Sequence, residues 1–151
     1  MDKGIYCLVL RNPACIVHVG ALGARAFASG FHVYVGSAQG SGGLQRVRRH
    51  ILLAQDRDRR PKWHIDYLLT SNTFELFSVI CASTEQKFEC RLAKTLPGTP
   101  VPQFGCSDCS CSSHLFHTHN DPGDGIRIAF QGLWLVPAIT TLNTPGAKGI
   151  I

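Results

Sequence analysis

Residues 4–10 read GIYCLVL, an unbroken apolar run that the turn signal Asn12-Pro13 ends. A short apolar run bounded by a turn signal is typical of a strand that is covered on both faces. A second strand is predicted over residues 31–36, where β-branched and aromatic residues are enriched. Each of these two strands carries a tyrosine, Tyr6 in the first and Tyr34 in the second.

Further along the chain, strand and helix patterns alternate. Residues 15–19 and 74–81 are expected to be strands, and residues 44–55 a helix with apolar side chains at spacings of three and four. Ser83 and Gln86 form a capping-box pattern that predicts a second helix ending near Leu96. The structure of residues 63–69 stays open at this level. The expected fold is α+β, with a small, mainly antiparallel central sheet flanked by helices.

Composition limits the class of protein. The chain has 151 residues, of which 44% are apolar and 17% charged, so it can build one core but not two ordinary domains. No apolar stretch approaches the ~18 residues of a membrane span, and the N-terminus lacks a signal-peptide pattern. Three of the seven cysteines, Cys7, Cys81 and Cys90, lie in apolar runs and are expected to be buried and reduced. These features favour a cytoplasmic protein without a membrane partner.

The positive charge is concentrated in one stretch of the chain. The net charge is +5, and seven cationic residues fall close together: Arg46, Arg48, Arg49, Arg57, Arg59, Arg60 and Lys62. Such a run is as consistent with a solvated helix face as with a nucleic-acid surface. Arg46 and His50 are four positions apart on the predicted helix, so both can point at one ligand.

The order of these motifs resembles the GIY-YIG nuclease superfamily. The motifs that carry this resemblance are, in chain order, Gly4-Ile5-Tyr6, Tyr34-Val35-Gly36, Arg46 with His50 on a helix, and Glu89 on a later helix. The segments 63–69 and 89–93, together with the later Phe-Gly, Asp-Cys-x-Cys and Ser-His-Leu-Phe elements, are similar to the Uri-type endonuclease subfamily. The resemblance covers about residues 3–117, so we expect a nuclease-like domain over residues 1–119 and a C-terminal extension of undefined role over residues 120–151.

The resemblance implies roles for individual residues. Glu89 would hold one Mg²⁺ or Mn²⁺ ion, Arg46 would neutralise the cleaved phosphate, and Tyr6 would activate the attacking water. Tyr34 and His50 would orient the phosphate and move protons. A guanidinium and a metal ion both stabilise the charge that develops when a phosphodiester is cut. The residues expected to contact nucleic acid are Gly36, Ser37, Arg48, Arg49, Lys62 and His64.

The chain departs from the superfamily at two places. Tyr6 and Tyr34 are far apart, which an inserted pair of strands at about residues 14–29 would explain. The superfamily's late asparagine has no obvious counterpart, and Asp108 and His114 are the candidates to replace it. His64 and Asp66 either contact the substrate or water next to the metal site, or form a local hydrogen bond with each other.

A zinc site is the alternative use of the late cysteines and histidines. Cys106 and Cys109 have the spacing of half a zinc knuckle, and Cys111, His114 and His117 follow. Structural zinc sites usually combine ligand pairs from separate segments, and here every candidate lies in one short segment. We therefore expect a single Mg²⁺ or Mn²⁺ ion rather than zinc.

The expected function is metal-dependent hydrolysis of DNA, including branched or structured nucleic acid. The resemblance implies that one active site cuts one strand and leaves a 5′-phosphate and a 3′-hydroxyl. Two alternatives stay open: a non-catalytic nucleic-acid-binding module of the same fold, and a zinc-bearing interaction protein.

Overall fold

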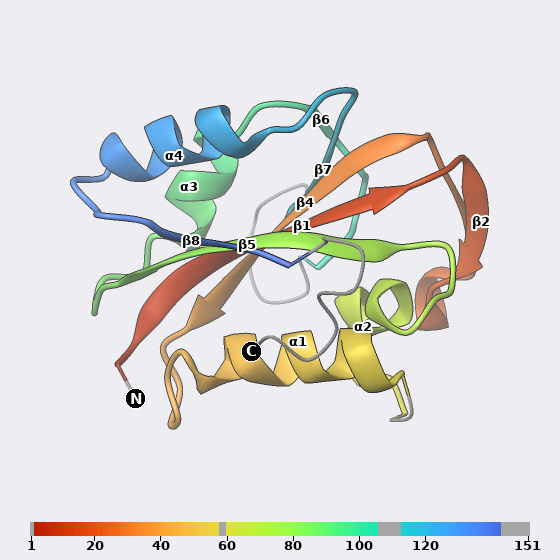
Figure 1. The fold of residues 1–151 in the computed structure, drawn as a ribbon, viewed down its shortest axis with the longest axis horizontal. Helices are drawn as coiled ribbons and strands as arrows, with labels where there is room; N and C mark the ends of the chain where they lie inside the picture. Colours follow the sequence, from red (N-terminus) through yellow and green to blue (C-terminus); the bar gives the residue numbers. More distant parts are fainter. Residues whose placement is uncertain (1, 58–59, 106–112, 143–151) are drawn as a thin grey trace.

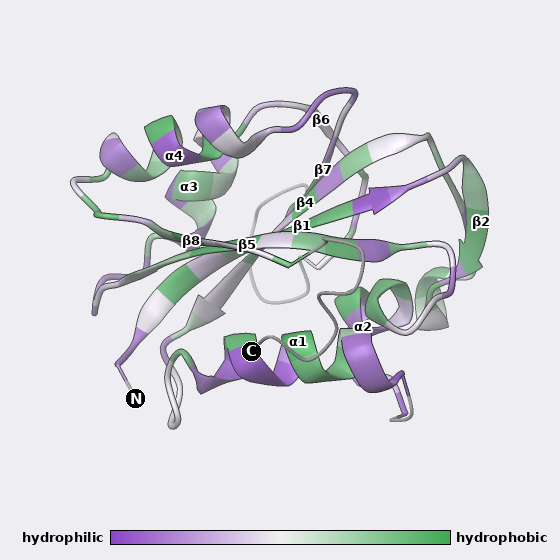
Figure 2. Ribbon diagram, in the orientation of Figure 1, coloured by the Kyte–Doolittle hydropathy of each residue, from purple (hydrophilic) through white to green (hydrophobic). Residues whose placement is uncertain are grey.

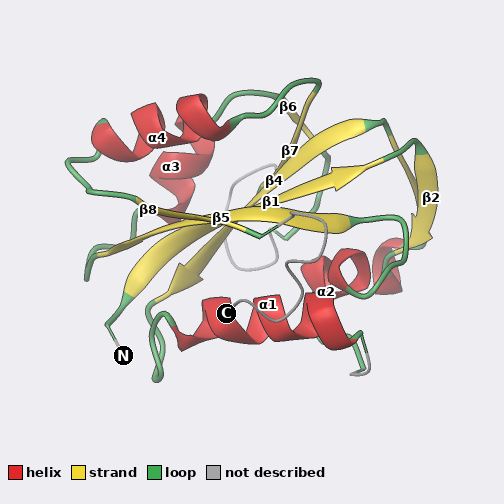
Figure 3. Cartoon of the chain, viewed as in Figure 1, coloured by secondary structure: helices red, strands yellow, loops and turns green. Residues whose placement is uncertain are grey.

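The computed structural model describes residues 2–57, 60–105 and 113–142. Within these ranges a six-stranded antiparallel sheet, in the order β6-β7-β4-β1-β5-β8, lies between helices α1 and α2 on one face and α3 and α4 on the other (Figure 1, Figure 3). The strands of the sheet are β1 (Gly4–Asn12), β4 (Gly30–Ala38), β5 (Glu75–Ser83), β6 (Thr99–Pro100), β7 (Leu115–Thr118) and β8 (Ala138–Thr141). The helices are α1 (Gln45–Asp56), α2 (His64–Leu69), α3 (Glu89–Thr95) and α4 (Gly123–Gln131). The expected α+β fold is confirmed.

Strand β1 is the centre of the core because every side chain from Ile5 to Leu10 is buried. Successive side chains of a strand point to opposite faces of the sheet. Tyr6, Leu8 and Leu10 therefore join the core under α1 and α2. Ile5, Cys7 and Val9 point the other way and join the core under α3 and α4. An apolar run without alternation is thus explained by a strand with a core on each face.

The predicted insertion between the two tyrosine strands is a separate hairpin. Strands β2 (Cys15–His18) and β3 (Ala24–Phe27) pair with each other, with the short 3-10 helix η1 (Gly20–Leu22) between them. The hairpin lies at one end of the sheet near α2 (Figure 1). Because β1 and β4 still pair along their whole length, the insertion does not disturb the tyrosine strands.

Helix α1 follows the predicted periodicity. Val47 and Ile51 are buried against the sheet, while Arg48 is exposed on the opposite side. Figure 2 shows the hydrophilic outer face of this helix and the hydrophobic face turned to the sheet. The helix ends at Asp56 and is capped by Arg57, whose left-handed backbone donates its N–H to the carbonyl of Leu53.

The predicted start of the second helix is wrong. Ser83 is the last residue of β5 and pairs with Gly4, and α3 begins only at Glu89. The Thr84 hydroxyl accepts the N–H of Gln86 and forms a local turn instead of a helix cap. Sheet pairing thus overrides the capping-box pattern. The later start places Glu89 in the first turn of α3.

The described part of the C-terminal extension belongs to the same sheet and core. Ile126, Ala129 and Phe130 of α4 are buried in the core under α3, and β8 pairs with β5. None of the helices in the described ranges has the length and apolar character that a bilayer crossing requires.

Candidate active site

The two tyrosine strands meet in a register that glycine makes possible. Tyr6 of β1 stands directly opposite Gly36 of β4, and a Cβ atom added at Gly36 would overlap the phenol end of Tyr6. The ring therefore occupies the space that a side chain at position 36 would need. Gly4 is constrained in the same way, because an added Cβ would collide with the carbonyl oxygen of Ala82.

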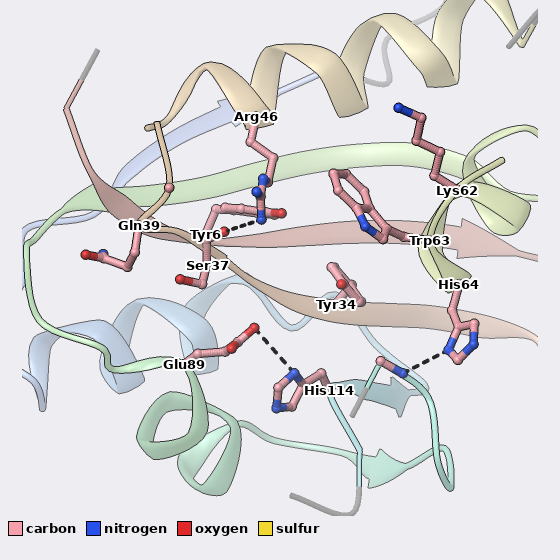
Figure 4. Close-up of a pocket in the computed structure, with 12 residues that line it drawn as sticks. Tyr6, Tyr34, Ser37, Gln39, Arg46, Lys62, Trp63, His64, Glu89 and His114 are labelled. Carbon is pink, nitrogen blue, oxygen red and sulfur yellow. Dashed lines mark hydrogen bonds and ion pairs between the residues drawn. The ribbon is translucent and has the colours of Figure 1, made fainter. Parts of the chain in front are cut away.

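A pocket opens where β4 passes the end of β7. Strand β7 begins at Leu115, which pairs with Tyr34, so Gly36–Ala38 have β1 on one side and no strand of the described chain on the other. The pocket has a volume of about 430 Å³ (Figure 4). Its lining comes from many elements: Tyr6, Tyr34, Ser37, Gln39, Gly40, Arg46, Lys62, Trp63, His64, Glu89, Gly105 and His114.

Tyr6 is buried and hydrogen-bonded to a histidine of α1. Its hydroxyl lies 2.8 Å from Nε2 of His50. Burial is the main reason that the pKa of the phenol is raised well above its ordinary value, and nearby Tyr34 adds to the rise. Burial likewise lowers the pKa of His50 to about 4, although the Asp66 carboxylate opposes the shift. At neutral pH both groups are uncharged, so the Tyr6 hydroxyl donates to the imidazole nitrogen.

His50 lies behind Tyr6 and does not line the pocket. Its side chain is 1% exposed, and its Nδ1 atom has no hydrogen-bond partner in the described chain. Arg46, one helical turn earlier, does reach the pocket, where its guanidinium donates to the carbonyl oxygen of Ser37 at 2.9 Å. The i, i+4 spacing directs both side chains toward Tyr6 and β4. Only Arg46 lines the pocket, so the expectation that both residues point at one ligand stays a prediction.

Glu89 enters the pocket from the other face of the sheet. Its carboxylate oxygen Oε2 lies 3.4 Å from Nδ1 of His114 (Figure 4). The Glu89 side chain is about one-third exposed, whereas His114 is buried. A partly exposed carboxylate with room for water beside it suits Mg²⁺ or Mn²⁺, which keep several water ligands. The described residues contain no cluster of three or more acidic, histidine or cysteine side chains that could hold a metal ion on its own.

The other predicted contact residues divide into two groups. Ser37, Lys62 and His64 line the pocket, and the Nδ1 atom of His64 accepts the N–H of Gly105 at 3.3 Å. Burial lowers the pKa of His64, and Arg25 adds to this. Arg48 is exposed outside the pocket lining, and Gly36 lies beneath the Tyr6 ring.

Arg49, which is partly buried, and Asp66, which is fully buried, form an ion pair behind the pocket wall. The two nitrogens of the Arg49 guanidinium lie 3.3 and 3.1 Å from the Asp66 carboxylate, which also accepts the N–H groups of Lys62 and Trp63. Burial alone would raise the pKa of Asp66, but these four hydrogen bonds outweigh it and lower the pKa. Asp66 caps α2 and makes no hydrogen bond with His64 in the described chain. It therefore positions the wall rather than meeting a ligand.

The late cysteines and Asp108 lie outside the described residues. Cys106, Cys109 and Cys111 all fall within residues 106–112, which the structure does not describe, so the zinc alternative stays a prediction. His117 does not contact the same groups as His114. Its Nε2 atom lies 2.8 Å from the carbonyl oxygen of Ser29. Cys7 is fully buried, as expected, whereas Cys81 and Cys90 are only partly buried. Cys7, Cys15 and Cys81 are free thiols.

Sequence reasoning missed four lining residues: Gln39, Gly40, Trp63 and Gly105. The Gln39 amide donates to the carbonyls of Gly4 and Thr84 and so joins the ends of β1 and β5, a contact without a sequence signal. Trp63 did carry a signal, because an aromatic residue between a lysine and a histidine is typical of nucleic-acid surfaces.

Comparison with curated proteins and with solved structures gave no match to this chain. The family described as "Domain of unknown function DUF123" matches residues 5–134. This range contains every residue of the pocket lining and most of the fold, from β1 through α4. The chain therefore belongs to the family Domain of unknown function DUF123.

Proposed function

We propose that this protein is a metal-dependent DNA endonuclease of the GIY-YIG superfamily, close to its Uri-type members. It hydrolyses a phosphodiester bond in one strand and leaves a 5′-phosphate and a 3′-hydroxyl. One observation carries the proposal: Tyr6, Arg46 and Glu89, from β1, α1 and α3, line the same pocket. Water activation, phosphate neutralisation and metal binding are the three tasks of such a reaction.

The hydrogen bond between Tyr6 and His50 supplies a route for the water proton. The raised pKa of Tyr6 disfavours a free phenolate, so the phenol can accept a proton only as it passes its own proton to Nε2 of His50. Hydroxide then forms a bond to phosphorus, the bond from phosphorus to the 3′-oxygen breaks, and that oxygen takes up a proton from solvent water. His50 is neutral above about pH 4 and is thus ready to accept at neutral pH.

Arg46 and Lys62 place positive charge at the pocket, where the phosphate of a substrate would lie. A guanidinium neutralises the charge that grows on the phosphoryl oxygens, and removing one such donor typically costs ~10²–10³ in rate. The bond from Arg46 to the Ser37 carbonyl holds the guanidinium ready.

Glu89 is the residue that would hold the metal ion, with water completing its coordination. A bound divalent ion supplies Lewis-acid stabilisation of the phosphoryl oxygens. His114 lies against the Glu89 carboxylate and so fixes its orientation. The donor set of one carboxylate with water favours Mg²⁺ or Mn²⁺ over zinc.

The test is nicking of supercoiled plasmid DNA with Mg²⁺ or Mn²⁺, and with EDTA as the blank. Wild-type protein should produce nicked circles, while Glu89→Ala and Arg46→Ala should be slower by about 10²-fold or more. Arg127→Ala is the matched control, because Arg127 is a cation on α4 and does not line the pocket. Circular dichroism checks that each variant is folded.

Folded Glu89→Ala or Arg46→Ala protein that nicks as fast as wild type would contradict the proposal. Salt-dependent DNA binding without turnover in any metal would instead support the non-catalytic binding module.

A further inference from the structure

Trp63 is a partly exposed aromatic ring on the wall of the pocket. Its side chain is 40% exposed, although a ring of this size usually contributes to a core. The other large exposed apolar side chains of the described chain are Ile16, Ile128, Trp134, Val136 and Ile139, and none of them lines this pocket. Trp63 is therefore placed where a ligand of the pocket would meet it.

The ring is held in a fixed position. The Arg49 guanidinium carbon lies 4.4 Å from the ring centroid, and the Asp66 carboxylate binds both Arg49 and the backbone N–H of Trp63. The His50 ring lies 6.0 Å from the Trp63 ring. A ring that is fixed before binding loses little conformational entropy when a ligand stacks on it.

The surroundings of the ring select a flat, anionic ligand. Arg46 is 5.0 Å from the ring centroid, and Lys62 is its neighbour in the chain (Figure 4). A phosphate held by Arg46 brings the bases of the same strand within reach of Trp63. Cationic side chains next to an aromatic platform are the arrangement that proteins use to bind unpaired nucleotides.

A continuous duplex cannot use this platform because its bases are already stacked on one another. Taking a base out of the duplex costs pairing and stacking free energy, and the cost is lowest for a base that is unpaired. Resting on the nuclease function proposed above, we propose that Trp63 stacks on an unpaired base beside the cleaved phosphodiester. The preferred substrate class is then DNA with an unpaired nucleotide at the cleavage site: a single strand, a flap or a bulge.

Tryptophan fluorescence tests this without any cleavage. The chain has two tryptophans, and Trp134 is 92% exposed outside the pocket, so a Trp134→Phe protein reports on Trp63 alone. In EDTA, this protein is titrated with a single strand, a duplex carrying a one-nucleotide bulge, and the fully paired duplex of the same sequence. The single strand and the bulged duplex should quench the emission strongly, and the paired duplex should quench it weakly.

Binding affinity gives the second readout. Trp63→Ala should weaken binding of the bulged duplex about tenfold and leave binding of the paired duplex within about twofold, whereas Trp63→Phe should keep most of the preference. An abasic nucleotide at the bulge should cause the same loss with unmodified protein, and no further loss with Trp63→Ala. The abasic arm needs no variant, so it decides the matter even if Trp63→Ala is unstable.

Equal quenching by all three DNAs, or an abasic bulge bound as tightly as the intact one, would overturn the stacking. If stacking is found but no metal supports cleavage, the nuclease proposal fails and the stacking stands. If cleavage occurs on bulged and paired DNA alike, the stacking fails and the nuclease proposal stands. A protein that binds none of the DNAs contradicts both.

Discussion

The hydroxyl of Tyr6 lies 2.8 Å from Nε2 of His50, and both side chains are buried between β1 and α1. A buried phenol and a buried imidazole each resist becoming charged, so neither is a convenient base by itself. In the proposed reaction, the hydrogen bond between them would carry a proton from water at the pocket to the imidazole. That role would need both members of the pair.

Replacing Tyr6 by Phe and His50 by Gln should each slow nicking by about 10²-fold or more, because each change interrupts the same proton route. The double variant should be no slower than the worse single variant, since groups that act as a unit are not additive. Single-turnover nicking rates measure this. Tyr67→Phe is the control, because Tyr67 does not line the pocket. Losses that multiply would show that the two residues act independently.

The central strands and the helix over residues 44–55 could be predicted because burial imposes a period on the sequence. The apolar run at residues 4–10 and the stripe containing Val47 and Ile51 both reflect contact with a core. The start of α3 could not be predicted, because Ser83 pairs with Gly4 in the sheet, and this contact joins segments that are far apart in the sequence.

The site was predictable in composition but not in its contacts. Tyr6, Arg46 and Glu89 were expected together because their order resembles a known superfamily. The bond from Tyr6 to His50 depends on how α1 packs on the sheet, and the contact of Glu89 with His114 joins α3 to the residue before β7. Neither geometry follows from spacing along the chain.

Two buried histidines should make the fold sensitive to mild acid. Burial lowers the pKa of His50 and of His32 to about 4, and His117 adds to the shift at His32. Since unfolded histidine titrates near 6.5, the unfolded chain binds more protons between pH 6.5 and 4, and stability falls as the pH falls through this range. The loss from pH 7 to pH 5 should be on the order of 2 kcal/mol for each histidine.

Urea unfolding at pH 7 and pH 5 measures this loss. A His32→Gln protein should lose roughly half of the pH dependence, because only His50 then titrates at a lowered pKa. Unfolding midpoints that do not move between the two pH values would contradict the prediction.

Gly36→Ala should destabilise the protein and disable the pocket together. The added Cβ would overlap the Tyr6 ring, which must move and stretch its bond to His50. Forcing a side chain into packed space costs about 1–3 kcal/mol. Gly132→Ala is the control, because Gly132 has a helical backbone and an added Cβ there meets only ordinary contacts. Thermal unfolding and plasmid nicking of both variants give the comparison, and a Gly36→Ala protein of wild-type stability and activity would refute the packing argument.

Asp66→Asn should be far more costly than the loss of a surface ion pair. The Asp66 side chain is fully buried and receives four hydrogen bonds, two from Arg49 and two from the backbone of Lys62 and Trp63. Breaking a buried pair leaves the remaining charge without compensation and typically costs about 3–5 kcal/mol, although the partial exposure of Arg49 favours the lower end. Glu75→Gln is the matched control. It removes the exposed ion pair with Arg11 and should change stability by less than about 1 kcal/mol. Urea unfolding compares the two variants.

Because Asp66 also fixes Trp63, the Asp66→Asn protein should bind bulged DNA more weakly even at temperatures where it is fully folded. Unchanged binding would show that the wall of the pocket holds its shape without the carboxylate.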